Sequence, residues 1–354
     1  MATALLADDL APPEPAAEPF HLSAGWARCW AEAYGEGEAI ELPLGGGRLR
    51  LAGAQGRFGP LRFPLLTSAT NLQTCYFDVA GAATAEALAS LPARLLATGA
   101  VQVRIDWLDA SSRLLAAGHA WRRRRHRVTV EPFAVSPLAD CRGSFEAYLG
   151  RAGSSVRKYW KACRRMILEG PIEFRIVTGG TGLSALVDEM FALEAAGWKG
   201  REGTAILSKD EDARFYRALA FAAAEAGALR IATLREEGRL LAYEYCVVGG
   251  GSVLAMKVGY DESRGRLQPG HMVALMNIRE ACGDPAIAWY DMLGNGMRVA
   301  QYKRRFATDY RTLHRVRLFA ETPMGGLLYA LYRARPFAKA LRDRLRSLTG
   351  SRSR

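Results

Sequence analysis

The order of predicted secondary structure repeats once along the chain, and this repeat limits the folds that the chain can adopt. The second half closes with three antiparallel strands followed by a helix, a strand, a helix and a strand. The first half follows the same order without evident sequence identity. A length of 354 residues is typical of about two domains. We therefore expect an α+β protein of two tandem units, each a mostly antiparallel mixed sheet flanked by helices.

The composition divides the chain into four segments. Residues 1–20, rich in Ala, Pro and acidic side chains, are expected to form a flexible leader. The first unit is predicted over 21–136, starting with a helix capped by Ser23, and the second over 137–322. A basic amphipathic tail is expected over 323–354.

Turn and capping residues define the elements of the second half. The predicted strands are 228–235, 240–248 and 252–260, with tight turns at Glu237-Gly238 and at Gly249–Gly251. Ser208 followed by Glu211 is typical of a capping box, so a helix is predicted to begin at Ser208 and to end near Gly227.

The first half contains weaker signals. The Gly45–Gly47 run predicts a turn between strands 38–44 and 47–54. A long loop is expected around Pro60 and Pro64, and a further strand at about 73–79.

The overall composition indicates a soluble globular protein. The spacing of its Cys and His residues predicts no metal site. Hydrophobic residues make up 49% of the chain and charged residues 24%, which excludes wholesale disorder. The six cysteines lie far apart, so we expect reduced thiols, and no Cys/His cluster has the spacing of a zinc site. No apolar run is long enough to cross a membrane and no secretory signal is evident, so the expected location is the cytoplasm.

Positive charge is concentrated at the carboxy terminus. The formal net charge is +12, and the last 32 residues contain eight Arg or Lys residues against one Asp. The segment 325–348 has the pattern of a basic amphipathic helix, which fits either an anionic membrane surface or docking on its own domain. A second basic cluster, Arg122–Arg127, has no accompanying nucleic-acid motif, so specific nucleic-acid binding is not expected.

Several short segments of the second half resemble a known family when they are taken together and in order. They are Leu193–Lys199, Lys257–Glu262 followed by Pro269-Gly270, Asp291–Gly294, and Tyr302-Lys303. With the element order of residues 145–320, they resemble the CelD/BcsL-like branch of the GNAT acyltransferases, whose relatives include the tandem-domain Fem-type transferases. The first half shares the resemblance only in topology. The resemblance implies direct acyl transfer from acetyl-CoA or another acyl-CoA, with no metal.

The resemblance also implies where the donor binds. The amides at the start of a helix near Gly270 can hold a pyrophosphate, and Arg264 and Arg266 add positive charge there. This sequence departs from the family pattern, because Arg266–His271 has one glycine and includes Pro269, which lacks an N–H. An ordinary helix start is the alternative. The predicted donor-binding residues are Lys257, Arg264, Arg266, Pro269, Gly270, His271, Tyr302 and Lys303.

Catalysis in this fold requires few side chains. A main-chain amide of strand 252–260 would polarise the thioester carbonyl, and a neighbouring base would deprotonate the acceptor. Asp291 is the preferred base, with a turn acceptor as the alternative role, and His271 is the second choice. The resemblance implies that Tyr260 protonates the departing thiolate, with packing in the strand as the alternative role. Glu194 is predicted to act with the acceptor-binding residues Trp198, Lys199, Glu244, Asp261 and Gly294, although packing or ordinary ion pairs explain several of them equally well.

Lys257 lies in an otherwise apolar strand and needs a compensating negative group. It either forms a buried pair with Asp261 or Glu244, or faces the cleft and binds an anion. The sequence does not decide between these two environments.

The predicted function is N- or O-acyl transfer to a sugar-type acceptor in envelope or exopolysaccharide production, with peripheral contact to the inner membrane or to a polysaccharide synthase as an option. The first alternative is a Fem-like transferase that uses aminoacyl-tRNA, which the basic segment 151–165 favours. The second is an inactive GNAT-fold scaffold of a polysaccharide-synthesis complex.

Overall fold

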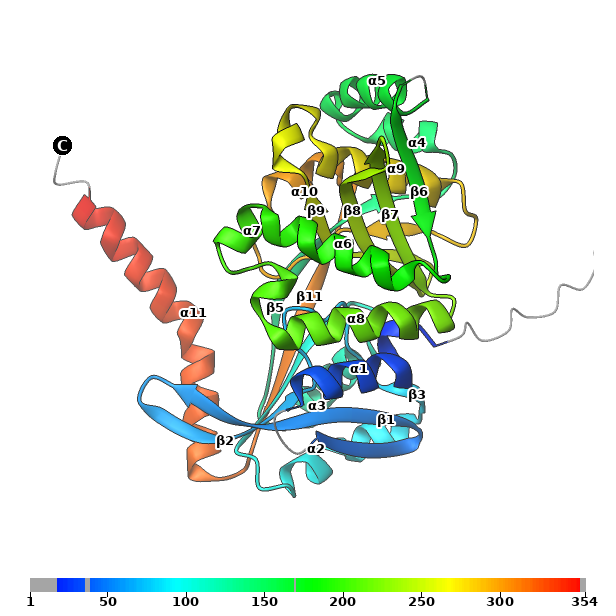
Figure 1. Ribbon diagram of the computed structural model, residues 1–354. Coiled ribbons are helices and arrows are strands. Elements are labelled where there is room, and N and C mark those ends of the chain that lie inside the picture. Colours follow the sequence, from blue (N-terminus) through cyan, green and yellow to red (C-terminus); the bar gives the residue numbers. More distant parts are fainter. Residues whose placement is uncertain (1–17, 36–38, 169, 351–354) are drawn as a thin grey trace, which may run out of the picture.

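The computed structural model describes residues 18–35, 39–168 and 170–350. These residues form an 11-stranded sheet in the order β3-β1-β2-β4-β11-β5-β10-β9-β8-β7-β6, with helices on its faces (Figure 1). The α+β class and the largely antiparallel sheet predicted from the sequence are confirmed. Almost all of the predicted leader 1–20 lies outside the described residues.

The first half begins with helix α1 (Ala24–Tyr34), where the Ser23 hydroxyl accepts the Trp26 N–H at 3.2 Å, as predicted. The elements that follow are β1 (Ala39–Phe58), β2 (Leu61–Ser68), β3 (Ala80–Ala83), α2 (Ala85–Leu96), β4 (Gln102–Leu108), α3 (Arg113–Arg123) and β5 (Val128–Asp140). Helix α1 packs beside α8 of the second half rather than on its own half alone (Figure 1).

The predicted turn at Gly45–Gly47 is wrong, because β1 runs through it as one strand. The first part of β1 pairs with β3 and the last part pairs with β2, so the real hairpin turn follows Phe58, at Gly59-Pro60. A Cβ on Gly47 would lie 2.8 Å from the Ala80 carbonyl oxygen. The glycines thus permit close approach of β3, a long-range contact that the local sequence does not reveal.

The second half has the predicted order of elements. They are α4 (Phe145–Arg151), α5 (Ser154–Leu168), β6 (Ile172–Val177), α6 (Leu183–Ala196), α7 (Trp198–Arg201), η2 (Ile206–Ser208), α8 (Asp210–Glu225), β7 (Leu229–Glu236), β8 (Arg239–Gly249), β9 (Ser252–Tyr260), η3 (Glu262–Leu267), α9 (Pro269–Cys282), β10 (Trp289–Asp291), α10 (Gln301–Phe306) and β11 (Asp309–Phe319). Both predicted hairpin turns are present, with positive φ at Glu237 and Gly238 and at Gly250 and Gly251.

The capping box predicted at Ser208 is wrong, since α8 begins at Asp210 and Ser208 ends the short helix η2. The Ser208 N–H bonds to the Ala205 carbonyl, and the Ile206 N–H bonds to the buried Glu194 carboxylate at 2.7 Å. These bonds hold the preceding turn in place. The acidic first turn of α8 then interacts favourably with the helix dipole.

The two halves are interleaved through β5 and β11. Strand β11, which comes last in the chain, lies between β4 and β5 of the first half. The end of β5 pairs with β10 of the second half. The predicted boundary between residues 136 and 137 therefore falls inside a continuous strand.

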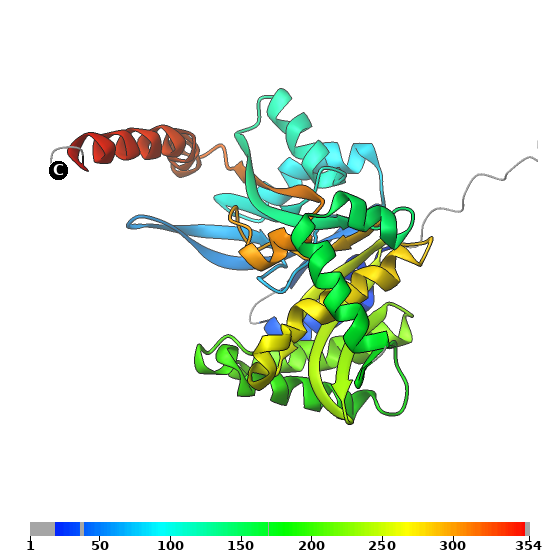
Figure 2. The same ribbon diagram turned by 90° about the horizontal axis from the view of Figure 1, so that it is seen from above.

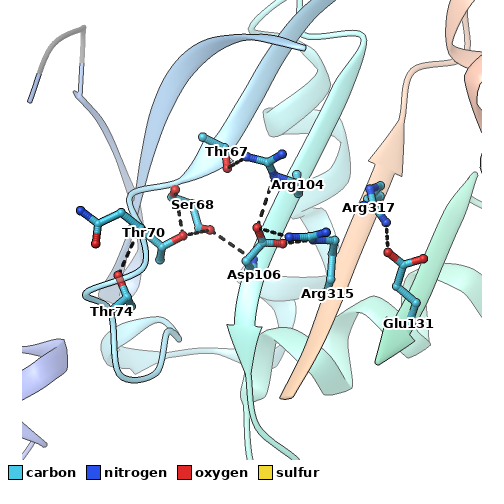
Figure 3. A network of polar contacts seen from close by, with 10 residues as sticks. Thr67, Ser68, Thr70, Thr74, Arg104, Asp106, Glu131, Arg315 and Arg317 are labelled. Atoms are coloured by element: carbon cyan, nitrogen blue, oxygen red, sulfur yellow. Dashed lines mark hydrogen bonds and ion pairs between the residues drawn. The ribbon is translucent and has the colours of Figure 1, made fainter. Parts of the chain in front are cut away.

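Charged side chains connect β11 to the strands on both sides of it (Figure 3). Arg315 donates to both oxygens of the buried Asp106 on β4, with an Nη2–Oδ2 distance of 2.8 Å, and Arg104 approaches the same carboxylate at 3.4 Å. Arg317 pairs with Glu131 on β5. Because a one-residue slip would leave these charges without partners, the pairs favour a single register for the inserted strand.

A long helix, α11 (Pro323–Gly350), begins on the first half and projects away from the body (Figure 2). Its first turns are anchored by aromatic contacts, with Tyr332 4.9 Å from Phe58 and 5.6 Å from Phe319 between ring centroids. Leu327 and Phe337 are exposed. Within the described residues, no helix combines the length and apolarity needed to span a bilayer.

Candidate active site

A cavity of about 390 Å³ lies where β9 and β10 separate. These parallel strands pair over only three residues, ending at Leu254 and Asp291. Beyond that point β9 continues to Tyr260 without β10 beside it. The cavity is lined by this free part of β9, by the residues after β10, by α9 and α10, and by the segment around Gln73 from the first half.

Strand β9 contains a bulge at the cavity. Tyr245 pairs with Lys257 and Cys246 pairs with Ala255, so Met256 is an extra residue on β9. A bulge leaves the extra residue out of the ladder and re-aims neighbouring groups. Main-chain amides at Met256 and Lys257 are therefore candidates to polarise a carbonyl placed in the gap.

The cavity connects the two faces of the sheet. Ala255 and Val258 pack on the face covered by α9, whereas Met256 packs on the face covered by α6 and α8. The α9 side contributes Glu244, His271, Tyr302 and Lys303 to the lining, and the α8 side contributes Lys257, Asp212 and Tyr216, among others. Two reactants can thus approach one another from opposite faces.

Glu244 is the buried carboxyl group on the α9 side of the lining. It accepts a hydrogen bond from Asn277 Nδ2 at 2.9 Å, and it is 5% exposed. Burial raises the pKa of Glu244, with Asn277 and the charge of Lys303 opposing the rise. A carboxyl with a raised pKa that faces a cavity is suited to proton transfer.

Lys303 holds the chain that follows β10. Its ammonium donates to the carbonyls of Met292 and Leu293, both at 2.6 Å. Burial lowers the pKa of Lys303 to about 8. Leu293 has a positive φ of 50° and lines the cavity, as does Trp107 with a φ of 65°. Such strained backbone is concentrated at functional sites in proteins.

The amides at the start of α9 are largely engaged within the protein. The Gln268 carbonyl accepts the N–H groups of His271 at 2.9 Å and Met272 at 3.1 Å, and it also accepts the Tyr159 hydroxyl at 2.9 Å. Pro269 has no N–H. The Tyr260 ring lies against Gly270, where a Cβ would be 3.0 Å from it. The helix start therefore offers few free donors to a pyrophosphate.

His271 lies beside these groups and lines the cavity. Its Nδ1 is 3.1 Å from Gln268 Oε1 and 3.3 Å from Arg305, and its ring is stacked with that of Tyr302. Burial and the charge of Arg305 lower the pKa of His271. The neutral imidazole is thus favoured at neutral pH.

Several predicted residues lie outside the cavity lining. Two of them form ion pairs with residues that are not part of the site. Arg264 pairs with Glu236, and Asp261 caps η3 and pairs with Arg239 at 2.5 Å. Trp198 and Arg266 are both exposed. The structure does not bring Arg264, Arg266, Asp261, Trp198, Tyr260, Pro269 or Glu194 into the lining.

Glu194 does not line the cavity itself but contacts a residue that does. Its carboxylate is 2% exposed, accepts the Lys199 ammonium at 2.6 Å, and accepts the Ile206 N–H. Lys199 also donates to the Val258 carbonyl at 2.6 Å. Glu194 therefore positions Lys199, which lines the cavity, against β9.

Asp291 is fully buried where the two halves meet. It accepts the hydroxyls of Tyr76 and Ser136 and the Leu293 N–H, and Arg311 lies 3.4 Å away. Burial raises the pKa of Asp291, although Arg311 and these hydrogen bonds oppose the rise. Asp291 does not line the cavity. Its base role stays a prediction, and its surroundings favour a positioning role.

The sequence reasoning named none of the residues that the first half contributes to the site. Gln73, Thr74 and Trp107 line the cavity, and Tyr34 and Gln73 bind Asp212 of α8, at 2.5 Å and 3.2 Å. No local motif marks these residues. Among the described residues, no group of His, Cys, Asp and Glu side chains could hold a metal ion.

Comparison with known proteins agrees with this geometry. Residues 154–304 match the family described as acetyltransferase (GNAT) domain. This segment is therefore similar to GNAT acetyltransferase domains. The expected GNAT fold and the expected class of enzyme are thus confirmed at that level. A search of curated proteins gave no match.

Solved structures extend the likeness to both halves. FemX is 10% identical, with a TM-score of 0.56 over 88% of this chain and 96% of its own. The C-terminal domain of a candidate lysylphosphatidylglycerol synthetase from Agrobacterium fabrum is 12% identical, with a TM-score of 0.54 over 86% of this chain and 91% of its own. A conserved protein of unknown function from Bacteroides thetaiotaomicron is 10% identical, with a TM-score of 0.57 over 85% of this chain and 92% of its own. These likenesses show a shared fold.

Proposed function

We propose that the protein transfers an acyl group from acyl-CoA directly to an amine or hydroxyl of a sugar-type acceptor. The observation that carries this proposal is the cavity through the gap between β9 and β10, which lets donor and acceptor meet from opposite faces. The CelD/BcsL-like resemblance supports an acceptor from envelope or exopolysaccharide production. A donor bound on the α9 side would place its carbonyl at the β9 bulge.

The residues of the cavity supply the roles that this reaction needs. Amides at Met256 and Lys257 would stabilise the oxyanion, and Glu244 would accept the proton of the attacking group. Lys303 would keep the chain after β10 away from the gap through its bonds to Met292 and Leu293. Tyr302 and His271 would contact the donor at the α9 side.

A second candidate is aminoacyl transfer from tRNA, which one specific observation favours. The start of α9 offers few free amides to a pyrophosphate, whereas α5 presents exposed basic side chains beside it. These are Arg157, Lys158, Lys161, Arg164 and Arg165. Tyr159 of α5 donates to the carbonyls of Leu267 and Gln268, so this basic surface adjoins the donor side. The fold shared with FemX is compatible with this donor.

Thermal unfolding with each donor separates the two candidates. Acetyl-CoA at about 100 times its dissociation constant should stabilise the protein by roughly 2.7 kcal/mol, measured as a rise in Tm. Stabilisation by tRNA that is lost at high salt, with none from acetyl-CoA, would favour the second candidate, because phosphate contacts release counterions. Stabilisation by neither donor would favour an inactive scaffold.

We also propose that α11 binds an anionic membrane surface. The helix projects from the body, exposes Leu327 and Phe337, and lies in the most basic part of the chain (Figure 2). Lys and Arg near an anionic surface each contribute about 1 kcal/mol. Contact with a membrane would place the cavity close to a membrane-linked acceptor.

Liposome sedimentation tests this proposal. The full chain should bind vesicles containing anionic lipid at low salt at least tenfold more tightly than a truncation to residues 1–335. This truncation removes six of the eight basic residues of the tail and keeps Leu328 and Tyr332, which pack on the body. Equal binding by the two proteins would exclude the membrane role of α11.

A further inference from the structure

Lys257 has neither of the partners that its sequence suggests. Asp261 pairs with Arg239, and Glu244 bonds to Asn277 on the other face of the sheet. The Lys257 ammonium lies 5.3 Å from the centroid of the Tyr216 ring, and no ion pair within the described residues includes it. The lysine therefore faces the cavity without a carboxylate bound to it.

The surroundings of Lys257 make an anion its natural partner. Burial lowers the pKa of Lys257, with the Lys199 and Lys209 charges acting in the same direction and Glu194 and Asp212 opposing it. Lys199 is engaged by Glu194 and by the Val258 carbonyl. Lys209 is exposed at the edge of the same cavity. An anion entering from this side would meet two available ammonium groups, and a half-buried cation gains most from such a partner.

A negative group faces the same side of the cavity. The Asp212 carboxylate is 8% exposed and is held from the first half by the Tyr34 hydroxyl at 2.5 Å and by Gln73 Nε2 at 3.2 Å. Gln73 is fixed in turn, because its Oε1 accepts the Tyr216 hydroxyl at 2.7 Å. The two halves together therefore fix one carboxylate beside the cationic groups.

We infer that the acceptor of the proposed reaction carries both an anionic group, which binds Lys257, and an amine, which binds Asp212. The inference rests on the proposed function and narrows its acceptor to amine-bearing phosphates or carboxylates. The first half acts as a specificity element, since Tyr34 and Gln73 orient Asp212. Neutral sugars and simple amines lack one of the two groups and should bind weakly.

Calorimetric titration of the full-length protein tests the anion contact. Glucosamine 6-phosphate should bind at least tenfold more tightly than glucosamine, and alanine at least tenfold more tightly than alaninamide if a carboxylate is the preferred anion. The inference requires tighter binding of the anionic compound in at least one of these two pairs. Lys257→Met should abolish the preference, Lys257→Arg should retain it within about threefold, and Arg62→Met, an exposed charge outside the lining, should leave it unchanged.

The amine contact is tested with glucose 6-phosphate in place of glucosamine 6-phosphate. Asp212→Asn keeps one acceptor oxygen, which can still accept the Tyr34 hydroxyl but leaves Gln73 Nε2 without its acceptor, and the variant should lose the preference for the amine. Equal or absent binding within both acceptor pairs, or an unchanged preference in Lys257→Met, would overturn the inference. These titrations contain no donor, so they test the acceptor contacts separately from the reaction. If the anion preference is present but the protein binds neither acetyl-CoA nor tRNA, the proposed function is contradicted and the inferred anion contact is not.

Discussion

Glu244→Gln is expected to lower turnover at least 100-fold while leaving donor affinity within about twofold. General bases typically contribute 10²–10⁴-fold, and the amide cannot take up the proton of the acceptor. Asn277 can still bond to the amide oxygen, so the fold should be retained. Steady-state kinetics together with donor titration measures the two effects separately.

The dependence of turnover on pH gives a second test of the base role of Glu244. A base acts only after losing its own proton, so turnover should rise with pH through the raised pKa of Glu244. Glu244→Gln should lose this rising limb. Glu173→Gln, an exposed carboxylate on β6, is the matched control and should retain it. A variant at Glu244 with near wild-type turnover and an intact rising limb would remove Glu244 from the mechanism.

Asp291→Ala is expected to lower the free energy of unfolding by about 3 kcal/mol or more. The substitution leaves the Tyr76 and Ser136 hydroxyls and the Leu293 N–H without their buried acceptor, and each such loss costs about 1–3 kcal/mol. Urea denaturation measures the change. Asp188→Ala removes an exposed carboxylate paired with Arg217 and should change stability by about 0.5 kcal/mol or less.

Asp291→Asn separates the two roles considered for this residue. Asn keeps one acceptor oxygen, so the variant should be more stable than Asp291→Ala and should keep turnover within about tenfold. Loss of turnover without loss of stability would instead identify Asp291 as the base predicted from the sequence. An unchanged urea midpoint in Asp291→Ala would contradict the positioning role.

The hairpins of the second half were predictable because their signals are local. Gly238 and the Gly250-Gly251 pair adopt positive φ readily, and the strands beside these turns are apolar enough to be recognised. The turn predicted at Gly45–Gly47 is wrong for the opposite reason. Its glycines meet a strand more than 30 residues later, and no local pattern records that approach.

The candidate site was predictable in part. Lys199, Glu244, Lys257, Gly270, His271, Gly294, Tyr302 and Lys303 were all selected from the sequence and all line the cavity. The family resemblance supplied most of these positions. Asp212 and Gln73 were not selected, because their importance comes from a contact between α8 and the first half.

The amino-acid sequence determined the α+β class, most element boundaries and the GNAT-like character of the second half, since these depend on periodicity, turn residues and short motifs. The tertiary structure decided how the halves interleave through β5 and β11, and which charges neutralise one another. Pairing between distant strands and side chains depends on three-dimensional proximity. For that reason the environment of Lys257, which the sequence leaves open, depends on the tertiary structure, in which Asp261 and Glu244 are bound to other residues.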